Sequence, residues 1–315
     1  MRTGSAASAP GRVIRLMHVV ELSNHPGDLL DDASRRRAAA EKHALSVYQD
    51  ALIRYRARVQ TVKVKRDRAR AQRRWGTWLR LAFAGWKEKR GVPRPPIPAA
   101  GHTDLEEKLM AGIAGEQLVA AELGRALADD WTLLHGYRNR RGEIDHLLLG
   151  PQGLFAIEVK NLNATVHVDG DRWRADKYDN YGNLVEQRPI ADAKGRSPSA
   201  QLNEPAGDLE RFLRERGQPV TVQRVVILAH RRSRIGTTRN LTVRVGTSAK
   251  YLLTLINSPS SQEPLSDQQR TGIRRLIQHD HAFHDKQRRD KPHRDKPHRD
   301  KRGRADPRPP GRPPR

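Results

Sequence analysis

The chain has 315 residues, of which 36% are hydrophobic, and it carries a formal net charge of +24. This length and this apolar content allow one sizeable domain with extensions and exclude two large domains. The sequence contains no cysteine, which excludes disulfides, zinc–thiolate sites and iron–sulfur clusters and predicts a reducing, cytoplasmic location. The excess of positive charge favours a polyanionic partner, either nucleic acid or an anionic membrane surface.

The chain begins with two segments of different composition. Residues 1–30 are a polar leader for which we predict a flexible structure, and no apolar run in the sequence is long enough for a membrane span. Residues 31–91 contain no proline and are rich in Ala, Leu, Arg and Lys, which predicts a basic arm of one or two long helices. A narrow apolar stripe along this arm would allow a coiled coil or a homodimer.

Three tryptophans, Trp75, Trp78 and Trp86, lie near the end of this arm among Arg and Lys residues. Indole rings between cationic side chains can stack on bases and contact phosphates, or they can lie at a membrane interface. A third interpretation is that this helix packs its tryptophans on the domain that follows. The sequence leaves the three interpretations open.

A proline-rich linker over residues 92–103 leads into a domain that we predict over residues 104–284. Its expected helices are 104–128, 198–216, 250–257 and 267–281, and its expected strands are 131–137, 143–149, 154–160, 165–168, 220–229 and 241–245. This order predicts an α/β core in which helices flank a mixed central sheet.

Residues 285–315 repeat the unit Asp-Lys-Pro-His-Arg and have no large apolar side chain to bury, which predicts a disordered basic tail. Such a tail would bind phosphates without sequence preference; the alternative is a solvated tail with no dedicated partner. His279, His281 and His284 stand just before it and could hold a transition metal. Their direct continuation into the polar tail does not favour that interpretation.

The strongest chemical signal is a hairpin in which Asp145, Glu158 and Lys160 interrupt two apolar runs. Residues 154–159 should form a strand buried on both faces, where unpaired charges cost several kcal/mol. Alternation puts Glu158 and Lys160 on one side, and the turn at residues 150–153 folds the Asp145 strand against them. A pocket with two acids and a lysine suits Mg²⁺ and a phosphate ester, whereas the alternative is a buried salt bridge that fixes register.

Two further residues belong to this pattern. Glu116 falls on the apolar face of the helix expected at 104–128, so its carboxylate should point inward, unless a slight rotation leaves it at the border of that face. His146 follows Asp145 and should point to the opposite side of the strand, where we expect it to pack rather than to bind a ligand.

Over about residues 108–230 the sequence resembles the PD-(D/E)xK nuclease superfamily, and within it the nuclease-related domain family, NERD. The resemblance rests on Gly115-Glu116, Glu143-Ile144-Asp145-His146, Gly153 with Ile157-Glu158-Val159-Lys160, and Gln201. One departure is the segment from Asp169 to Arg196, which is longer and more polar than usual and suggests enlarged substrate loops.

The resemblance implies a restriction-endonuclease-like core whose active site contains Mg²⁺ or Mn²⁺. It implies Asp145, Glu158 and Glu116 as metal ligands that also take part in catalysis. It further implies Lys160 as the catalytic lysine, and Gln201 as a polar catalytic helper from the following helix.

We therefore predict a metal-dependent nuclease, either an endonuclease or an exonuclease, that hydrolyses phosphodiester bonds in DNA and holds it with its basic extensions. One alternative is a catalytically inactive nucleic-acid-binding or scaffold protein that retains the nuclease fold. A second alternative is a protein attached to a membrane surface through the tryptophan-containing part of the arm.

Overall fold

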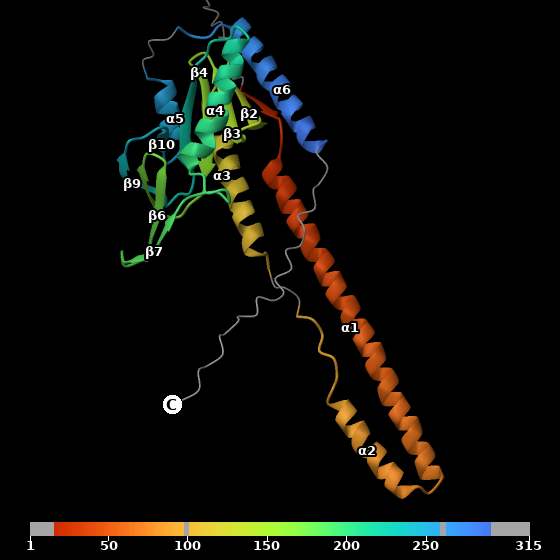
Figure 1. Cartoon of the computed structure of the whole chain (residues 1–315). Helices are drawn as coiled ribbons and strands as arrows, with labels where there is room; N and C mark the ends of the chain where they lie inside the picture. The colour runs from red at the N-terminus through yellow and green to blue at the C-terminus, as the bar shows by residue number, and fades with distance from the viewer. Residues whose placement is uncertain (1–15, 98–100, 259–262, 291–315) are drawn as a thin grey trace, which may run out of the picture.

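A six-stranded mixed sheet with the strand order β1-β2-β3-β4-β8-β10 forms the centre of the domain (Figure 1). The computed structural model describes residues 16–97, 101–258 and 263–290. The six strands are β1 (His18–Glu21), β2 (Thr132–Arg138), β3 (Glu143–Gly150), β4 (Gly153–Lys160), β8 (Val222–Leu228) and β10 (Arg244–Gly246). Strands β2, β3 and β4 are antiparallel neighbours, whereas β8 runs parallel to β4 and β1 runs parallel to β2.

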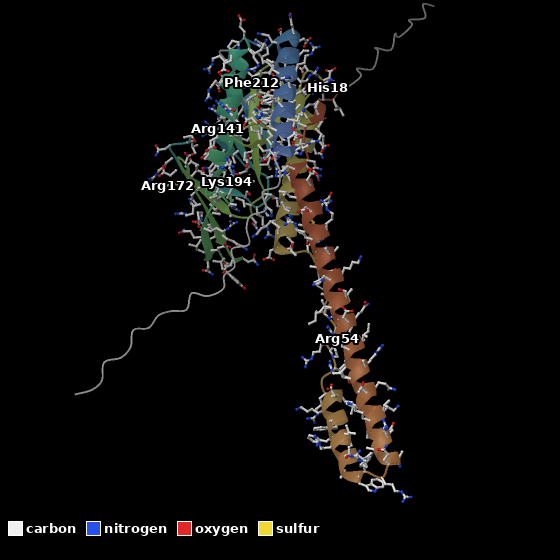
Figure 2. The ribbon with its side chains drawn as sticks, turned by 45° about the vertical axis from the view of Figure 1, so that its right-hand side comes forward. His18, Arg54, Arg141, Arg172, Lys194 and Phe212 are labelled. Carbon is white, nitrogen blue, oxygen red and sulfur yellow. The ribbon has the colours of Figure 1, made fainter. Side chains whose placement is uncertain are left out.

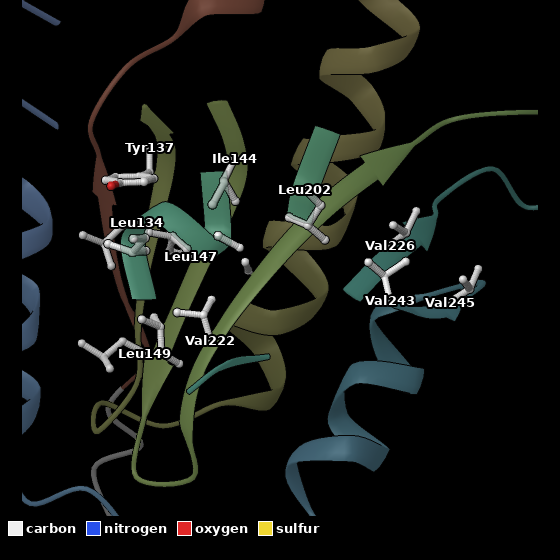
Figure 3. Packing of buried hydrophobic residues seen from close by; sticks show 14 of the residues in the cluster. Leu134, Tyr137, Ile144, Leu147, Leu149, Leu202, Val222, Val226, Val243 and Val245 are labelled. Carbon is white, nitrogen blue, oxygen red and sulfur yellow. The ribbon is translucent and has the colours of Figure 1, made fainter. Parts of the chain in front are cut away.

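Helices cover both faces of this sheet. They are α3 (Asp104–Ala126), α4 (Pro198–Glu215), α5 (Ala249–Ile256) and α6 (Asp267–Arg289). One apolar cluster joins the sheet to α4 and α6 through residues such as Leu147 and Leu202 (Figure 3), and a second joins it to α3 and α5 through Leu148 and Leu123. The alternation of Leu147 and Leu148 shows why a strand buried on both faces needs a nearly continuous apolar sequence. A mixed sheet between helices confirms the predicted α/β class.

The β3–β4 hairpin forms as the sequence predicts. Gly150 pairs with Gly153 across the turn, and every residue of β4 except Lys160 is buried. Gly153 has a φ of 123°, a conformation that a residue with a side chain rarely adopts. In the strand order this hairpin lies in the middle of the sheet. The ends of β3 and β4 that are far from the turn form its open end.

A second sheet, with the strand order β7-β6-β5-β9, lies beside the six-stranded sheet (Figure 1). Its strands are β5 (Thr165–Asp169), β6 (Arg172–Tyr178), β7 (Leu184–Pro189) and β9 (Arg234–Arg239). The expectation of enlarged polar loops between Asp169 and Arg196 is wrong for β6 and β7. Strand β7 is exposed along its whole length, so it carries no apolar alternation by which the sequence could reveal it.

The arm is a helical hairpin of α1 (His25–Ala71) and α2 (Trp75–Lys89) that extends away from the domain (Figure 1). Helix α2 packs along α1 and not on the domain, so the third interpretation of the tryptophans is wrong. At its other end α1 contacts α3, where Arg37 Nη1 donates to Glu106 Oε2 at 3.1 Å. Within the described ranges, no helix is both long enough and apolar enough to cross a bilayer.

Both ends of the chain differ from the sequence prediction. Residues 18–30 of the predicted leader contain regular elements, because β1 pairs with β2 and α1 begins at His25, where Pro26 and the Asn24 side chain start the helix. At the other end α6 continues to Arg289, so the predicted tail is helical over its first residues. Residues 291–315 of that tail, and residues 98–100 of the linker, lie outside the described residues.

Candidate active site at the open end of β3 and β4

The two central strands part at one end, and the predicted site residues lie there. The β3–β4 ladder ends at the pair His146 and Ile157. Beyond it, the backbone N–H of Val159 donates to Asp145 Oδ2 at 2.7 Å. Strand β4 continues beside β8 as far as Lys160. The Asp145 carboxylate is thus fixed by the backbone of the neighbouring strand, between the ends of the two strands.

Lys160 is held by two of the other predicted residues. Its Nζ donates to Glu158 Oε1 at 2.5 Å and to Gln201 Oε1 at 3.1 Å. Gln201 Nε2 donates to the carbonyl oxygen of Arg196 at 2.8 Å, which directs the amide oxygen toward the lysine. Gln201 reaches this position because Ser197 caps the start of α4, with its Oγ accepting a hydrogen bond from the third residue beyond it.

Glu116 approaches from α3 on the other side of the strands. Its side chain points inward, as the apolar face predicts, and the residue is 9% exposed. Glu116, Asp145 and Lys160 line one pocket of about 600 Å³. The same pocket has basic residues on its walls, namely Lys108, Lys177 and Arg188. His135 Nε2 lies 3.7 Å from Glu116 Oε2.

The electrostatics of this pocket are unusual for carboxyl groups. Burial raises the pKa of Glu116 to about 8, and the Asp145 and Glu158 charges add to the shift. Burial raises the pKa of Asp145 to about 6 against the opposing Lys160 cation, and burial and Asp145 raise the pKa of Glu158 to about 7. Burial disfavours the charged form of Lys160, but the Glu158 and Asp145 carboxylates outweigh it and raise the lysine pKa. Three carboxyl groups therefore titrate near neutral pH while the lysine stays charged.

A fourth carboxyl group near the site belongs to Glu143, for which the sequence predicted no role although it stands in the Glu143-Ile144-Asp145-His146 motif. Burial raises its pKa, although Arg138 Nη2 donates to Glu143 Oε2 at 2.5 Å and opposes that shift. Glu143 contributes to the raised pKa of both Glu116 and Asp145. Its position two residues before Asp145 on one strand was the available signal, because residues i and i+2 share a side of a strand.

His146 packs beneath the site, as the sequence predicts. It is fully buried, its Nε2 lies 3.2 Å from the carbonyl oxygen of Glu116, and its Nδ1 lies 3.0 Å from His135 Nδ1. Burial lowers the pKa of His146 to about 3, so the ring is neutral. The partnership with His135 depends on the β2–β3 register, which no local sequence signal gives.

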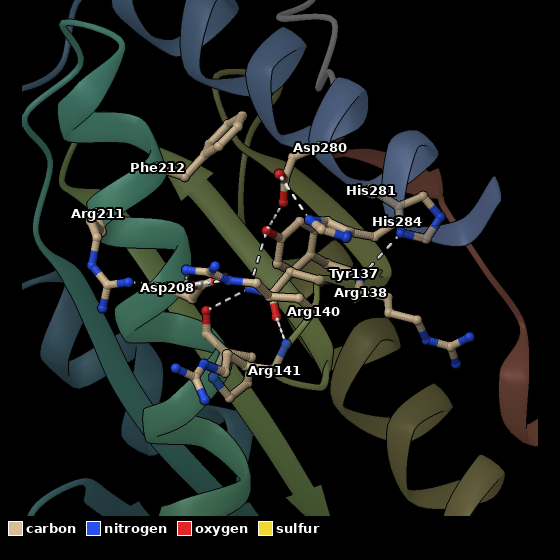
Figure 4. A network of polar contacts seen from close by, with 12 residues as sticks. Tyr137, Arg138, Arg140, Arg141, Asp208, Arg211, Phe212, Asp280, His281 and His284 are labelled. Atoms are coloured by element: carbon tan, nitrogen blue, oxygen red, sulfur yellow. Dashed lines mark hydrogen bonds and ion pairs between the residues drawn. The ribbon is translucent and has the colours of Figure 1, made fainter. Parts of the chain in front are cut away.

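The histidines of α6 have structural contacts instead of a metal site (Figure 4). His281 Nδ1 accepts a hydrogen bond from the Arg138 backbone N–H at 3.1 Å, and its Nε2 lies 3.1 Å from the carbonyl oxygen of Leu22. His284 lies 3.5 Å from the Asp280 carboxylate. These contacts dock α6 on β1 and β2.

The carboxylates of the pocket do not form a complete cage of protein ligands around a metal ion. They could instead serve as the partial ligand set that an ion such as Mg²⁺ takes from a protein. Among the residues that the structure describes, no three His, Cys, Asp or Glu side chains form a group that could hold a metal ion. Mg²⁺ usually takes only one or two carboxylates and completes its coordination with water and phosphate oxygens. Asp145 and Glu158 can supply that pair, whereas the larger ligand set that includes Glu116 stays a prediction.

Comparison with protein families agrees with this geometry. Residues 111–229 match the family model of the nuclease-related domain, NERD, and the mixed α/β fold is consistent with a nuclease-like fold. This match confirms the predicted resemblance to the NERD family, whose general assignment is the PD-(D/E)xK superfamily. It contains all five predicted site residues, whereas the arm, α5 and α6 lie outside it. Searches of curated proteins and of solved structures gave no match.

Proposed function

We propose that this chain is a metal-dependent nuclease that hydrolyses phosphodiester bonds in DNA with Mg²⁺ or Mn²⁺. The observation that carries the proposal is the pocket that Glu116, Asp145 and Lys160 line, together with the contact between Lys160 and the buried Glu158 beside it. The Asp145 and Glu158 charges add to the burial that raises the pKa of Glu116, and protons or a divalent cation would relieve this repulsion between like charges.

Each residue has a role that follows from its contacts. Asp145 and Glu158 would hold the cation, which when bound supplies Lewis-acid stabilisation of phosphate oxygens. Lys160 Nζ, oriented by Glu158 and Gln201, places a positive charge in the pocket and would stabilise charge that develops on the phosphate. Glu116, with a pKa of about 8, can take up or release a proton close to neutral pH.

The walls of the pocket support a polyanionic substrate. Lys108 comes from α3, Lys177 from β6 and Arg188 from β7, so three different elements bring cations to the rim. Phosphate contacts of this kind position a nucleic acid without reading its sequence. The second sheet thus contributes directly to the proposed substrate site.

The proposal is tested with the full chain, supercoiled plasmid DNA and a series of divalent ions. We expect nicking or cleavage with Mn²⁺ or Mg²⁺, none in EDTA, and loss of cleavage but not of DNA binding in Lys160→Ala. Lys250→Ala, which removes an exposed lysine of α5, is the matched control and should cut like wild type. Cleavage of an RNA substrate together with intact plasmid would show that the substrate class is wrong.

A catalytically inactive binding or scaffold protein is the second candidate, and one observation favours it. The 2.5 Å contact between Lys160 and Glu158 neutralises both groups without any ion. Titration calorimetry separates the candidates, because the nuclease should bind Mn²⁺ through a site that Asp145→Asn removes. A chain that binds DNA with a steep salt dependence, binds no Mn²⁺ and never cuts would be the inactive form.

A further inference from the structure

The short helix of the arm exposes a row of large apolar side chains. Trp75, Leu79, Phe83 and Trp86 are 59%, 62%, 66% and 50% exposed. Their spacing of four, four and three residues puts them on one side of α2, and we call this row the α2 stripe. Another side of the helix faces α1, where a Cβ added at Gly85 would lie 3.4 Å from the Val62 side chain.

The arm holds the α2 stripe on a long, anchored support. At the far end the two helices are joined by residues 72–74, and Ala69 is buried at 5% exposure near that turn. At the near end Ser34 and Arg37 both donate to the Glu106 carboxylate of α3, at 3.1 Å each. The 47 residues of α1 correspond to a rod of about 70 Å. The stripe therefore lies well away from the domain, and side chains of the arm project into solvent around it (Figure 2).

The surroundings of the stripe are strongly basic. Between residues 54 and 90 the sequence has fourteen Lys and Arg residues and only two Asp and Glu residues. Trp86 stacks on Phe83 with ring centroids 5.7 Å apart, and the Arg90 guanidinium lies 3.7 Å from the centroid of the Trp86 ring. Tryptophan, phenylalanine and leucine on one face, bordered by Lys and Arg, are typical of helices that lie in the interface of an anionic membrane.

We propose that the tip of the arm docks on an anionic phospholipid surface, with the α2 stripe inserted at headgroup level and the surrounding Lys and Arg side chains on lipid phosphates. Charge complementarity selects this occupant, because a second copy of the arm would bring two strongly basic surfaces together. Leu79 offers no ring on which a base could stack, and Trp86 already contacts Phe83 and Arg90. This docking is independent of the proposed nuclease activity.

The test is binding of the full chain to vesicles of phosphatidylglycerol and phosphatidylcholine, with vesicles of phosphatidylcholine alone as the uncharged reference. We expect co-sedimentation only with the anionic vesicles, together with a blue shift of tryptophan emission. Trp131 and Trp173 are only 4% and 3% exposed, so a shift on binding reports the tryptophans of α2. Quenching by brominated lipids should then locate these rings at headgroup depth without any variant.

Leu79→Glu combined with Phe83→Glu should lower vesicle affinity at least about tenfold, because it removes the apolar contact and adds like charge to the lipid. Val47→Glu combined with Ile53→Glu is the matched control, since both residues are exposed on α1, at 50% and 64%. That control should bind vesicles within about twofold of wild type, and both double variants should fold because every substituted side chain is exposed.

Three results would overturn the docking proposal. The first is an absence of binding to anionic vesicles at moderate salt. The second is a double variant at Leu79 and Phe83 that keeps its vesicle affinity but loses affinity for a single-stranded oligonucleotide, which would make the stripe a nucleic-acid surface. The third is a wild-type dimer that this double variant converts to a monomer in analytical ultracentrifugation, which would make the stripe an interface between two copies.

Discussion

The pocket buries charged side chains, whereas the arm exposes apolar side chains. In the pocket, the charges of Glu158 and Lys160 are enclosed by apolar strands and pair with each other. In the arm, Leu79 and Phe83 are exposed while the charges around them are spread through solvent. Folding stability favours neither arrangement, because buried charges and exposed apolar groups both cost free energy. The difference separates a region suited to chemistry on a small group from one suited to contact with a large surface.

The largest expected difference between a substitution in the pocket and one in the arm is at Asp145. Asp145→Asn should lower plasmid cleavage at least about 100-fold, because the pocket loses a carboxylate that we assign to the metal ion. The asparagine amide oxygen can still accept the Val159 N–H, so the fold should persist. Asp50→Asn is the matched control on the exposed surface of α1 and should leave cleavage unchanged. Equal losses in both variants would mean that the pocket holds no special carboxylate.

A buried polar contact of the domain should have a large effect on stability alone. Tyr137 Oη donates to Asp280 Oδ2 at 2.5 Å where α6 meets β2 (Figure 4). Asp280→Ala leaves this buried hydroxyl without its acceptor, and we expect the free energy of unfolding to fall by about 2 kcal/mol. Urea denaturation measures it, with Asp280→Asn as the control that keeps an acceptor oxygen and loses less. An unchanged midpoint in Asp280→Ala would show that α6 adds nothing to the stability of the sheet.

The raised carboxyl pKa values of the pocket predict that the stability of the protein depends on pH. The pKa of Glu116 rises from an ordinary value of 4.5 to about 8, so between these values the folded chain holds a proton that the unfolded chain has released. The stability of the ion-free protein should therefore fall as pH rises from about 4.5 to about 8 and then level off. Thermal denaturation in EDTA measures this fall.

Variants of α3 and added metal ion test whether Glu116 causes the predicted pH dependence of stability. Glu116→Gln should flatten the pH dependence of Tm, whereas Glu107→Gln, an exposed neighbour on the same helix, should not. Mn²⁺ should raise Tm more at pH 8 than at pH 5.5, because the ion competes with protons for the carboxylates. A Mn²⁺ effect that is equal at both values would contradict carboxylate ligands with raised pKa.

The features that could be predicted from the sequence are those that depend on local patterns of residues. The apolar runs and the Gly-Pro-Gln-Gly turn predict the hairpin that carries Asp145 and Glu158, and helical periodicity predicts the inward direction of Glu116. Gln201 is predicted as a site residue only through the family resemblance, and its contact with Lys160 is not predicted, because three strands separate α4 from β4 in the sequence. The catalytic roles of these residues stay predictions.

The features that the sequence hid depend on distant partners. Strand β1 has four residues and pairs with β2 more than 100 positions later, so nothing beside it in the sequence marks it as part of the sheet. Strands β6 and β7 alternate too weakly to stand out from a polar loop, yet their Lys177 and Arg188 line the pocket. The substrate-facing wall was therefore the part of the site least visible in the sequence.

The smallest effect is expected in the arm, where α1 and α2 share one exposed ion pair. Arg58 Nε lies 3.4 Å from Glu88 Oε2, and the two side chains are 55% and 34% exposed. Glu88→Gln should change the free energy of unfolding by less than about 0.5 kcal/mol, because solvent and salt screen such a pair. Circular dichroism melts compare it with Glu41→Gln, an exposed glutamate elsewhere on α1. A loss as large as that of Asp280→Ala would mean that this pair, and not the packing of α2 against Val62 and its neighbours, holds the hairpin closed.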